Sequence, residues 1–420
     1  MFLKKLTLEN VRSIRNLELS FDGAEGSPRQ WTMLLGENGA GKSTVLRSIA
    51  LALAGSNALP ELLADPEYWI RRDARGAEIR LDLVTGENEP REIALRLRRG
   101  QGLSRTFSEN RKTLQRLDAA LKHSPRNYFN IGYGVSRRLH SGRTLAFQKS
   151  EFMRSQRAQN VATLFSPDAL LQSVENWAMD IDYRKPKMAR AVLRQTFDDM
   201  LPGIDFDRID KLKRRLLFRT PDGPLPLDAL SEGYQNIISW CGDLLYRITE
   251  TFADYRNPLA ARGLLLIDEV DLHLHPLWQR KLSDFLQRKL KHFQIVATTH
   301  SPLTAHQACQ GELFLLRRPK AMRPPALESF PGDPSKMLLH QFLLSPAFGL
   351  ETADSRHIEL LKDEYSALKD ATRKTAPQKN RLTEVKQELA DAPEWQLNTP
   401  QAKKRVALLA EIRRALAKGR

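Results

Sequence analysis

One nine-residue segment limits the fold of this chain more than any other feature. It reads Gly36-Glu-Asn-Gly-Ala-Gly-Lys-Ser-Thr44 and lies between a short apolar stretch, Trp31 to Leu35, and an amphipathic helical pattern from Thr44 to Leu53. The spacing of its glycines, lysine and serine, between a strand and a helix, is that of a phosphate-binding loop. Glycines let successive backbone N–H groups and the helix N-terminus face an anion. The segment therefore predicts an α/β fold in which this loop holds the phosphates of a nucleotide.

The loop residues have separate predicted tasks. Lys42 would neutralise the β- and γ-phosphates, and the Ser43 hydroxyl would bind Mg²⁺, so ATP and Mg²⁺ are the expected ligands. The residues predicted to contact the nucleotide are Gly36, Glu37, Asn38, Gly39, Ala40, Gly41, Lys42, Ser43 and Thr44.

A pair of acids follows a second apolar segment, Leu264 to Ile267. A strand there would carry Asp268 to its carboxyl end, where the carboxylate can hold Mg²⁺ through water. Glu269 would then polarise the attacking water as a general base. Two acids after a strand are ordinary on their own, but downstream of a phosphate-binding loop they predict hydrolysis.

Two further motifs are weak alone and gain meaning beside the first two. Ser231-Glu232-Gly233 opens a helical pattern over 230–256, and a serine in that place is usually an N-cap. His300 ends the strand candidate that follows the acidic one, where it could donate a hydrogen bond to the γ-phosphate. The predicted catalytic set is therefore Glu269, Lys42 and His300.

Together these motifs resemble the ATPase group that joins ABC, SMC and RecF proteins with the overcoming-lysogenization-defect (OLD) family. The run from Asp268 to Pro276 is similar to the DEPELHLHP segment of the OLD-like ATPases, and the opening around Arg12 is similar to their first strand. Ile131-Gly-Tyr-Gly-Val-Ser-Arg137 resembles a segment near the ABC Q-loop, for which Gln148 is the candidate glutamine. Glu232 stands where ABC proteins usually have glycine.

The resemblance implies how the parts would work. Arg12 would approach the nucleotide, and Ser231, Glu232 and Gly233 of one subunit would cap the nucleotide on the Lys42 loop of another. A head-to-head homodimer or higher homo-oligomer is therefore expected, with slow hydrolysis that depends on association. The expected fold is an ABC-type ATPase head with a mixed sheet, an antiparallel β lobe, a helical insertion and a helical C-terminal region.

The sequence divides into five predicted parts. They are an N-terminal ATPase lobe with the loop (1–70), a basic β-rich and helical segment (71–149), a helical insertion (150–215), a C-terminal ATPase lobe (216–325), and a linker with helices (326–420).

The charge is uneven along the 420 residues, whose formal net charge is +16. Residues 71–149 hold 18 Lys and Arg against 8 Asp and Glu, and residues 401–420 hold 7 against 1. The first excess could be a solvated surface, a nucleic-acid footprint or a docking surface for an acidic protein. The tail is interpreted as an assembly or docking surface.

Several classes of protein are excluded. Two cysteines, Cys241 and Cys309, are too few for a disulfide scaffold or a zinc ribbon. No apolar run approaches the ~18 residues of a membrane span, and the N-terminus has no signal-peptide core. We therefore expect a cytoplasmic protein without membrane contact.

A nuclease module is also not expected in this chain. A Toprim site needs an Asp-x-Asp pair, and none occurs after His300, where the aspartates are Asp333, Asp354, Asp363, Asp370 and Asp391. The leading hypothesis is a sensor and scaffold ATPase of a prokaryotic anti-phage defence complex, similar to the ATPase subunits of Septu and PARIS systems. It would control a separate effector, a Toprim or HNH type nuclease or a toxin. The alternative is a DNA-binding repair ATPase like RecF, and a transporter ATPase is disfavoured by the altered signature.

Overall fold

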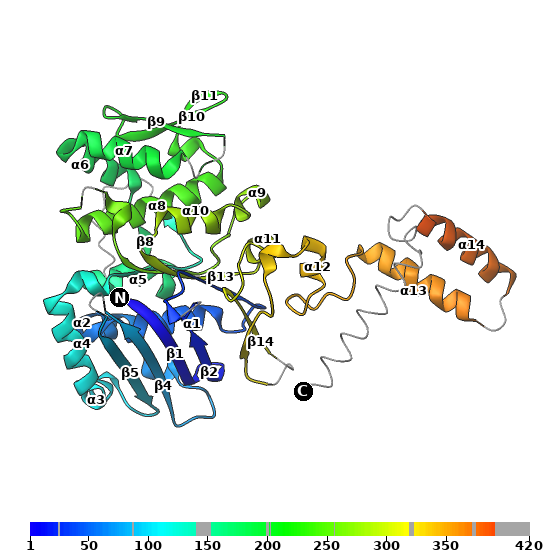
Figure 1. Ribbon diagram of the computed structural model, residues 1–420, viewed down its shortest axis with the longest axis horizontal. Helices are drawn as coiled ribbons and strands as arrows, with labels where there is room; N and C mark the ends of the chain where they lie inside the picture. Colours follow the sequence, from blue (N-terminus) through cyan, green and yellow to red (C-terminus); the bar gives the residue numbers. More distant parts are fainter. Residues whose placement is uncertain are drawn as a thin grey trace. The chain divides into compact units, whose positions relative to one another are not determined.

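The computed structural model forms two compact units, Met1–Phe342 and Leu343–Arg420 (Figure 1). The predicted Q-loop residue Gln148 and the basic tail 401–420 lie outside the residues that the structure describes, and the five-part division stays a prediction. None of the helices among the described residues is both long and apolar enough to cross a bilayer. The described residues are 1–23, 26–85, 88–139, 153–198, 201, 203–255, 257–318, 323–371 and 375–390.

A six-stranded sheet forms the centre of the larger unit. Its order is β15-β14-β3-β13-β12-β6, and every neighbouring pair is parallel except β14 and β15. β3, β12 and β13 are buried along their whole length, as strands covered on both faces are. The order strand, helix, strand along the sequence predicts that β12 and β13 pair in parallel, and the structure confirms it. The bounds are Trp31–Leu35 (β3), Asn130–Tyr133 (β6), Gly263–Ile267 (β12), Phe293–Thr299 (β13), Leu313–Arg317 (β14) and Ala326–Ser329 (β15).

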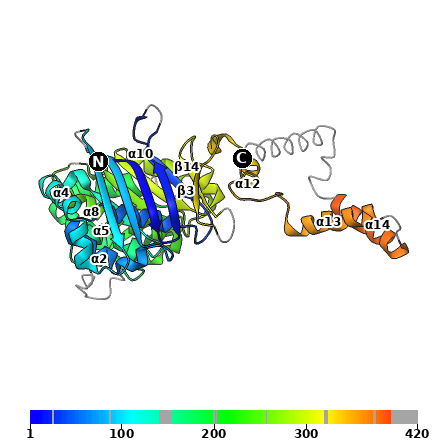
Figure 2. The ribbon, with the colours of Figure 1, turned by 90° about the horizontal axis from the view of Figure 1, so that it is seen from below.

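A second, antiparallel sheet has the order β2-β1-β4-β5, and Figure 2 shows its strands side by side in blue to cyan. Side chains along β4 alternate between buried and half-buried, so one face of the sheet packs inward. Apolar and polar residues alternate over 78–84 and 91–98, which predicts a hairpin, and the structure confirms it with Leu81 opposite Ile93. The bounds are Phe2–Val11 (β1), Ile14–Ser20 (β2), Gly76–Val84 (β4) and Pro90–Arg98 (β5).

Helix α1 (Lys42–Ala52) lies between the two sheets. Its Val45 and Ile49 belong to the same buried cluster as Leu81 of β4 and Val296 of β13. This burial fixes the start of α1 close to the carboxyl end of β3, with the predicted phosphate-binding loop between them. The other helices with members in this cluster or packed on it are α2 (Gly55–Leu63), α3 (Leu103–Glu109), α4 (Arg111–His123) and α5 (Gln156–Phe165).

Two successive residues of β6 show which helix covers each face of the six-stranded sheet. A side chain on Gly132 would collide with Leu164 of α5, whereas Tyr133 packs on Trp240 of α8 (Glu232–Thr251), with ring centroids 5.6 Å apart. Because neighbouring strand residues face opposite sides of a sheet, α5 and α8 cover opposite faces (Figure 1). The remaining elements between β6 and α8 are β7 (Arg138–Leu139), β8 (Leu170–Leu171), α6 (Val174–Arg184), α7 (Pro186–Phe197), β9 (Asp205–Asp210), β10 (Arg215–Thr220) and β11 (Gly223–Pro226).

Two segments differ from the sequence prediction. The sequence from Leu277 to Lys291 predicts one helix, but the structure has two short helices, α9 (Pro276–Gln279) and α10 (Leu282–Lys289). The first turn is held separately because Trp278 packs edge-on against Tyr234 of α8, with centroids 4.7 Å apart. The five prolines from Arg317 to Pro334 predict an irregular connection, but this stretch contains β15. β15 is an edge strand, where prolines just before the pairing are tolerated. The short helices beyond β13 are α11 (Pro302–Ala305) and α12 (Leu339–Leu343).

In the described part of the smaller unit, the two long helices are α13 (Arg356–Asp370) and α14 (Ala376–Ala390). Leu361, Val385 and Leu389 form their shared apolar cluster. Arg381 joins the helices by donating from Nε and Nη2 to both carboxylate oxygens of Glu364. This helical pair agrees with the predicted charged, helical pattern beyond residue 355.

Candidate nucleotide-binding site

The predicted phosphate-binding loop connects β3 to the first turn of α1, and its glycines are required by its shape. Gly39 and Gly41 have φ angles of 74° and 107°, in the left-handed region that favours glycine. A side chain on Gly36 would collide with the carbonyl oxygen of Leu316 in the neighbouring strand β14. Glu37, Asn38 and Gly39 are exposed, Gly36 and Ser43 are half-buried, and Ala40 and Thr44 are buried.

Lys42 lies with its ammonium group against the loop. Its Nζ donates to the carbonyl oxygens of Gly36 and Glu37 at 2.7 and 3.0 Å, and it lies 2.8 Å from Nε2 of His300. Burial lowers the pKa of Lys42, and the nearby carboxylates of Asp268 and Glu269 oppose that shift. Burial and the Lys42 charge lower the pKa of His300 below its ordinary value, which favours a neutral imidazole at pH 7. The structure therefore brings Lys42 of the loop and His300 into direct contact.

The two predicted acids follow β12 directly. Asp268 is buried and accepts a hydrogen bond from Oγ1 of Thr298, 2.7 Å from its Oδ1. The same hydroxyl accepts from the Glu269 N–H at 2.8 Å. The Glu269 carboxylate is partly exposed, and its Oε1 lies 3.6 Å from Nε2 of His300. Lys42, Glu269 and His300 thus lie together at the carboxyl ends of β3, β12 and β13.

The oxygen groups at this place suit Mg²⁺. Ser43 offers a hydroxyl and Asp268 a carboxylate, and oxygen ligands are the ones that this ion prefers. Among the described residues no cluster of three His, Cys, Asp or Glu side chains could hold a metal by itself. Mg²⁺ in nucleotide sites usually takes its remaining ligands from phosphates and water.

Arg12 sits in the turn between β1 and β2. Its backbone has a positive φ of 53°, and its guanidinium lies over the Trp69 indole, 4.4 Å from the ring centroid. Burial, then the charge of Arg47, lowers the pKa of Arg12. The next residue, Ser13, places its Oγ 3.6 Å from where a Cβ on Gly41 would stand. The turn that carries Arg12 therefore touches the phosphate-binding loop.

The predicted signature lies at the start of α8 and faces solvent. Ser231 is the N-cap residue by position, but its side chain makes no capping hydrogen bond. Ser231 and Glu232 are exposed, and Gly233 is half-buried, with a Cβ there only 2.9 Å from the His273 carbonyl oxygen. Because α1 and α8 lie on opposite faces of the six-stranded sheet, the signature belongs to a different surface from the loop.

One residue at the acidic motif was not among the predicted site residues. Arg137, from the segment after β6, donates from Nη2 to the carbonyl oxygens of Asp268 and Glu269 at 2.6 and 2.8 Å. The sequence signal was the resemblance of the Ile131–Arg137 segment to other ATPases, which assigned no task to the arginine.

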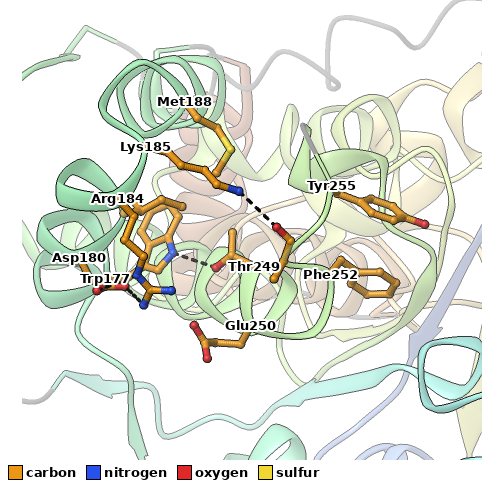
Figure 3. A pocket seen from close by; sticks show the side chains of 11 residues that line it. Trp177, Asp180, Arg184, Lys185, Met188, Thr249, Glu250, Phe252 and Tyr255 are labelled. Atoms are coloured by element: carbon orange, nitrogen blue, oxygen red, sulfur yellow. Dashed lines mark hydrogen bonds and ion pairs between the residues drawn. The ribbon is translucent and has the colours of Figure 1, made fainter.

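A separate cavity of about 100 Å³ lies between α6 and the end of α8 (Figure 3). Trp177 donates from its indole Nε1 to Oγ1 of Thr249 at 2.9 Å, and Lys185 donates to the Ala253 carbonyl oxygen at 3.3 Å. These polar groups are satisfied within the protein, and none of the predicted site residues lines the cavity.

The chain is similar in sequence to proteins of anti-phage defence systems and to a DNA-repair protein. The Septu protein PtuA of Bacillus mycoides (strain KBAB4) is 29% identical over 316 residues, covering 75% of this chain and 40% of that protein. The retron Ec83 probable ATPase of Escherichia coli is 32% identical over 125 residues, covering 30% of this chain and 23% of that protein. The DNA replication and repair protein RecF of Rickettsia felis is 42% identical over 65 residues, 16% of each chain. The chain thus spans less than half the length of these relatives.

Among solved structures, the SMC head domain from Thermotoga maritima aligns at 15% identity with a TM-score of 0.41, covering 79% of this chain and 99% of that chain. The family described as "AAA domain, putative AbiEii toxin, Type IV TA system" matches residues 32–305, which begin just before the phosphate-binding loop and end after His300. Since that match covers more than half of the sequence, the chain belongs to this AAA-domain family.

Proposed function

We propose that this chain binds and hydrolyses ATP as the sensor and scaffold subunit of a prokaryotic anti-phage defence complex. The observation that carries the ATPase part is the convergence of Lys42, Glu269 and His300 at the loop, with Lys42 and His300 2.8 Å apart. Membership of the AAA-domain family and similarity to Septu PtuA and retron ATPases support the defence role.

In the proposed reaction each side chain acts on a different part of ATP. The loop N–H groups and Lys42 neutralise the β- and γ-phosphates, and His300 donates a hydrogen bond to the γ-phosphate. Glu269 accepts a proton from the attacking water. Mg²⁺, held by Ser43 and by Asp268 through water, would neutralise charge on the phosphate oxygens. Arg12 approaches the nucleotide from the turn beside the loop.

The proposed active form is a homodimer or a larger homo-oligomer. The exposed Ser231, Glu232 and Gly233 of one subunit would cap the nucleotide bound by the Lys42 loop of another. An exposed helix N-terminus can offer N–H groups to an anion. Their place across the sheet from α1 supports a site completed between subunits, and hydrolysis would then be slow until subunits associate.

Two substitutions test the ATPase. Lys42→Ala should abolish ATP binding, measured by equilibrium dialysis. Glu269→Gln should bind ATP but lose turnover and accumulate as a dimer, measured by phosphate release and light scattering. Glu92→Gln, an exposed carboxylate on β5, is the matched control and should behave as the unaltered protein. Unchanged turnover in the Glu269 variant would rule out its role as general base.

The proposed partner is a separate cytoplasmic effector, a nuclease of the Toprim or HNH type or a toxin. The test is co-expression of the tagged chain with its neighbouring genes, followed by purification with ATP and with ADP. An effector retained in only one nucleotide state supports the proposal. If a co-expressed nuclease or toxin does not co-purify in either state, the scaffold role is contradicted.

A second candidate function is a DNA-binding ATPase related to RecF and SMC proteins, and a basic helix face favours it. Within the described residues, five exposed cations on or beside α4 have no carboxylate partner. Such a face can bind phosphates. Each phosphate contact removed should reduce the slope of log K against log salt concentration by about 0.9 in magnitude. Arg111→Gln with Arg116→Gln should therefore weaken duplex DNA binding, whereas Arg288→Gln on α10 should not. The five cations are Arg105, Arg111, Lys112, Arg116 and Lys122.

A further inference from the structure

The backbone at the predicted general base is held in an unusual conformation. Glu269 has a φ of 47°, a left-handed value that costs free energy for a residue with a side chain. Its N–H donates to Oγ1 of Thr298, and its carbonyl oxygen accepts from Nη2 of Arg137. The same Nη2 also binds the Asp268 carbonyl oxygen. One guanidinium therefore holds both peptide carbonyls of the acidic pair.

Burying the Arg137 guanidinium at this place costs free energy. Its side chain is buried, and burial lowers its pKa to about 10 despite the nearby carboxylates, so it stays charged at neutral pH. Its Nε donates to the Gly134 carbonyl oxygen at 3.1 Å, which holds the guanidinium to its own loop. A buried cation that donates to three main-chain carbonyl oxygens holds the backbone at those carbonyls in one conformation.

The same guanidinium touches the helix that begins with the signature. Its Cζ lies 6.0 Å from the ring centroid of Trp240 in α8, and Trp240 also packs on Tyr133. The Tyr133 hydroxyl donates to Oδ2 of Asp243, one turn further along α8, at 2.8 Å. The acidic pair and the signature helix of one subunit therefore meet at Arg137.

We infer that Arg137 is a positioning residue for ATP hydrolysis, which sets the Asp268–Glu269 backbone so that the Glu269 carboxylate points at the attacking water. It does not contact the nucleotide itself. The inference rests on the proposed ATPase function and adds a residue to it. A lysine at position 137 keeps the charge but loses the planar fork that reaches several carbonyls at once.

Arg157 supplies a matched control. Its side chain is half-buried, burial likewise lowers its pKa to about 10, and it donates to the carbonyl oxygens of Leu53 and Tyr128. It touches neither acid. Arg137→Lys should lower kcat by about tenfold or more, because a small misplacement of a catalytic group has effects of that size. The KM for ATP should change less than about twofold. Arg157→Lys should leave both constants unchanged even if it lowers the melting temperature.

The decisive measurement combines Arg137→Lys with Glu269→Gln in single-turnover assays. If Arg137 acts only through Glu269, the double variant should be no slower than Glu269→Gln alone. Equal losses of kcat in the Arg137 and Arg157 variants, or additive losses in the double variant, would overturn the inference. If Arg137→Lys does not fold, Thr298→Val tests the same backbone from its N–H side, with Thr298→Ser expected to restore turnover. Absence of turnover in the unaltered protein would refute the proposed function instead.

Discussion

Replacing Asp243 by alanine should be one of the most destabilising single changes in the larger unit. The Asp243 carboxylate is buried in α8 and accepts from Nε of Arg247 at 2.7 Å, the Tyr133 hydroxyl at 2.8 Å and the Gln172 N–H at 2.8 Å. Alanine would leave Arg247, which is also buried, without its counter-ion, and would remove the acceptor of two further donors. Breaking a buried ion pair from one side costs about 3–5 kcal/mol.

That free energy can be converted into a melting temperature. An unfolding entropy of about 2.1 cal/mol/K per residue gives about 0.7 kcal/mol/K for the unit Met1–Phe342. The expected loss is therefore about 4–7 °C, measured by circular dichroism or calorimetry.

The chain offers a control with the same residue types and spacing. Asp284 and Arg288 on α10 are also an Asp–Arg pair four residues apart, but both side chains are about two thirds exposed. Such a pair contributes about 0.3–0.5 kcal/mol, so Asp284→Ala should lower the melting temperature by less than about 1 °C. If Asp243→Ala and Asp284→Ala had similar effects, the argument from burial would be refuted.

Three further outcomes are expected. Gly36→Ala should lower the free energy of unfolding by on the order of 1–3 kcal/mol, because its methyl group would collide with a backbone carbonyl. In Gly39→Ala the methyl group meets no atom within 4 Å, so the loss should be only the roughly 1–2 kcal/mol that a positive φ costs an alanine. Urea unfolding measures both losses. Cys309 is exposed, but partial desolvation, followed by nearby carboxylates, raises its pKa. Its labelling by a thiol reagent should therefore speed up about tenfold per pH unit from pH 7 to 8.5. Cys241 is buried and should react only after denaturation. Val385→Asp should open the α13–α14 pair to protease, and the melting temperature of the larger unit should stay unchanged.

Local patterns were enough to predict much of the fold. The loop after β3, the acids after β12 and the hairpin of β4 and β5 each depend on residues close together in the sequence. Glycine spacing, apolar runs and alternation report such elements directly. The break between α9 and α10 was not predicted because its cause is far away in the sequence: Trp278 packs on Tyr234, which lies on another helix.

The contact between Arg137 and the acidic pair was also not predicted, because it too joins residues that are far apart in the sequence. Arg137 reaches Asp268 because β6 and β12 are neighbours in the sheet, although they lie far apart in the sequence. Strand order of this kind follows from the whole fold and leaves no periodic signal. The catalytic side chains were predictable because they stand in short motifs, whereas the group that holds their backbone is defined by the sheet.

Among the described residues of 71–149, the cations on the antiparallel sheet and those on α4 differ in their partners. On β4 and β5 the arginines are matched by acids: Arg80 and Arg96 both bind Glu78. Their charges are largely neutralised locally, and they stabilise the face of the antiparallel sheet. On α4 the exposed cations have no such partners among the described residues, so the positive potential concentrates there. A polyanion that binds this segment should therefore contact α4 rather than the sheet, and substitutions on the two surfaces should separate these outcomes.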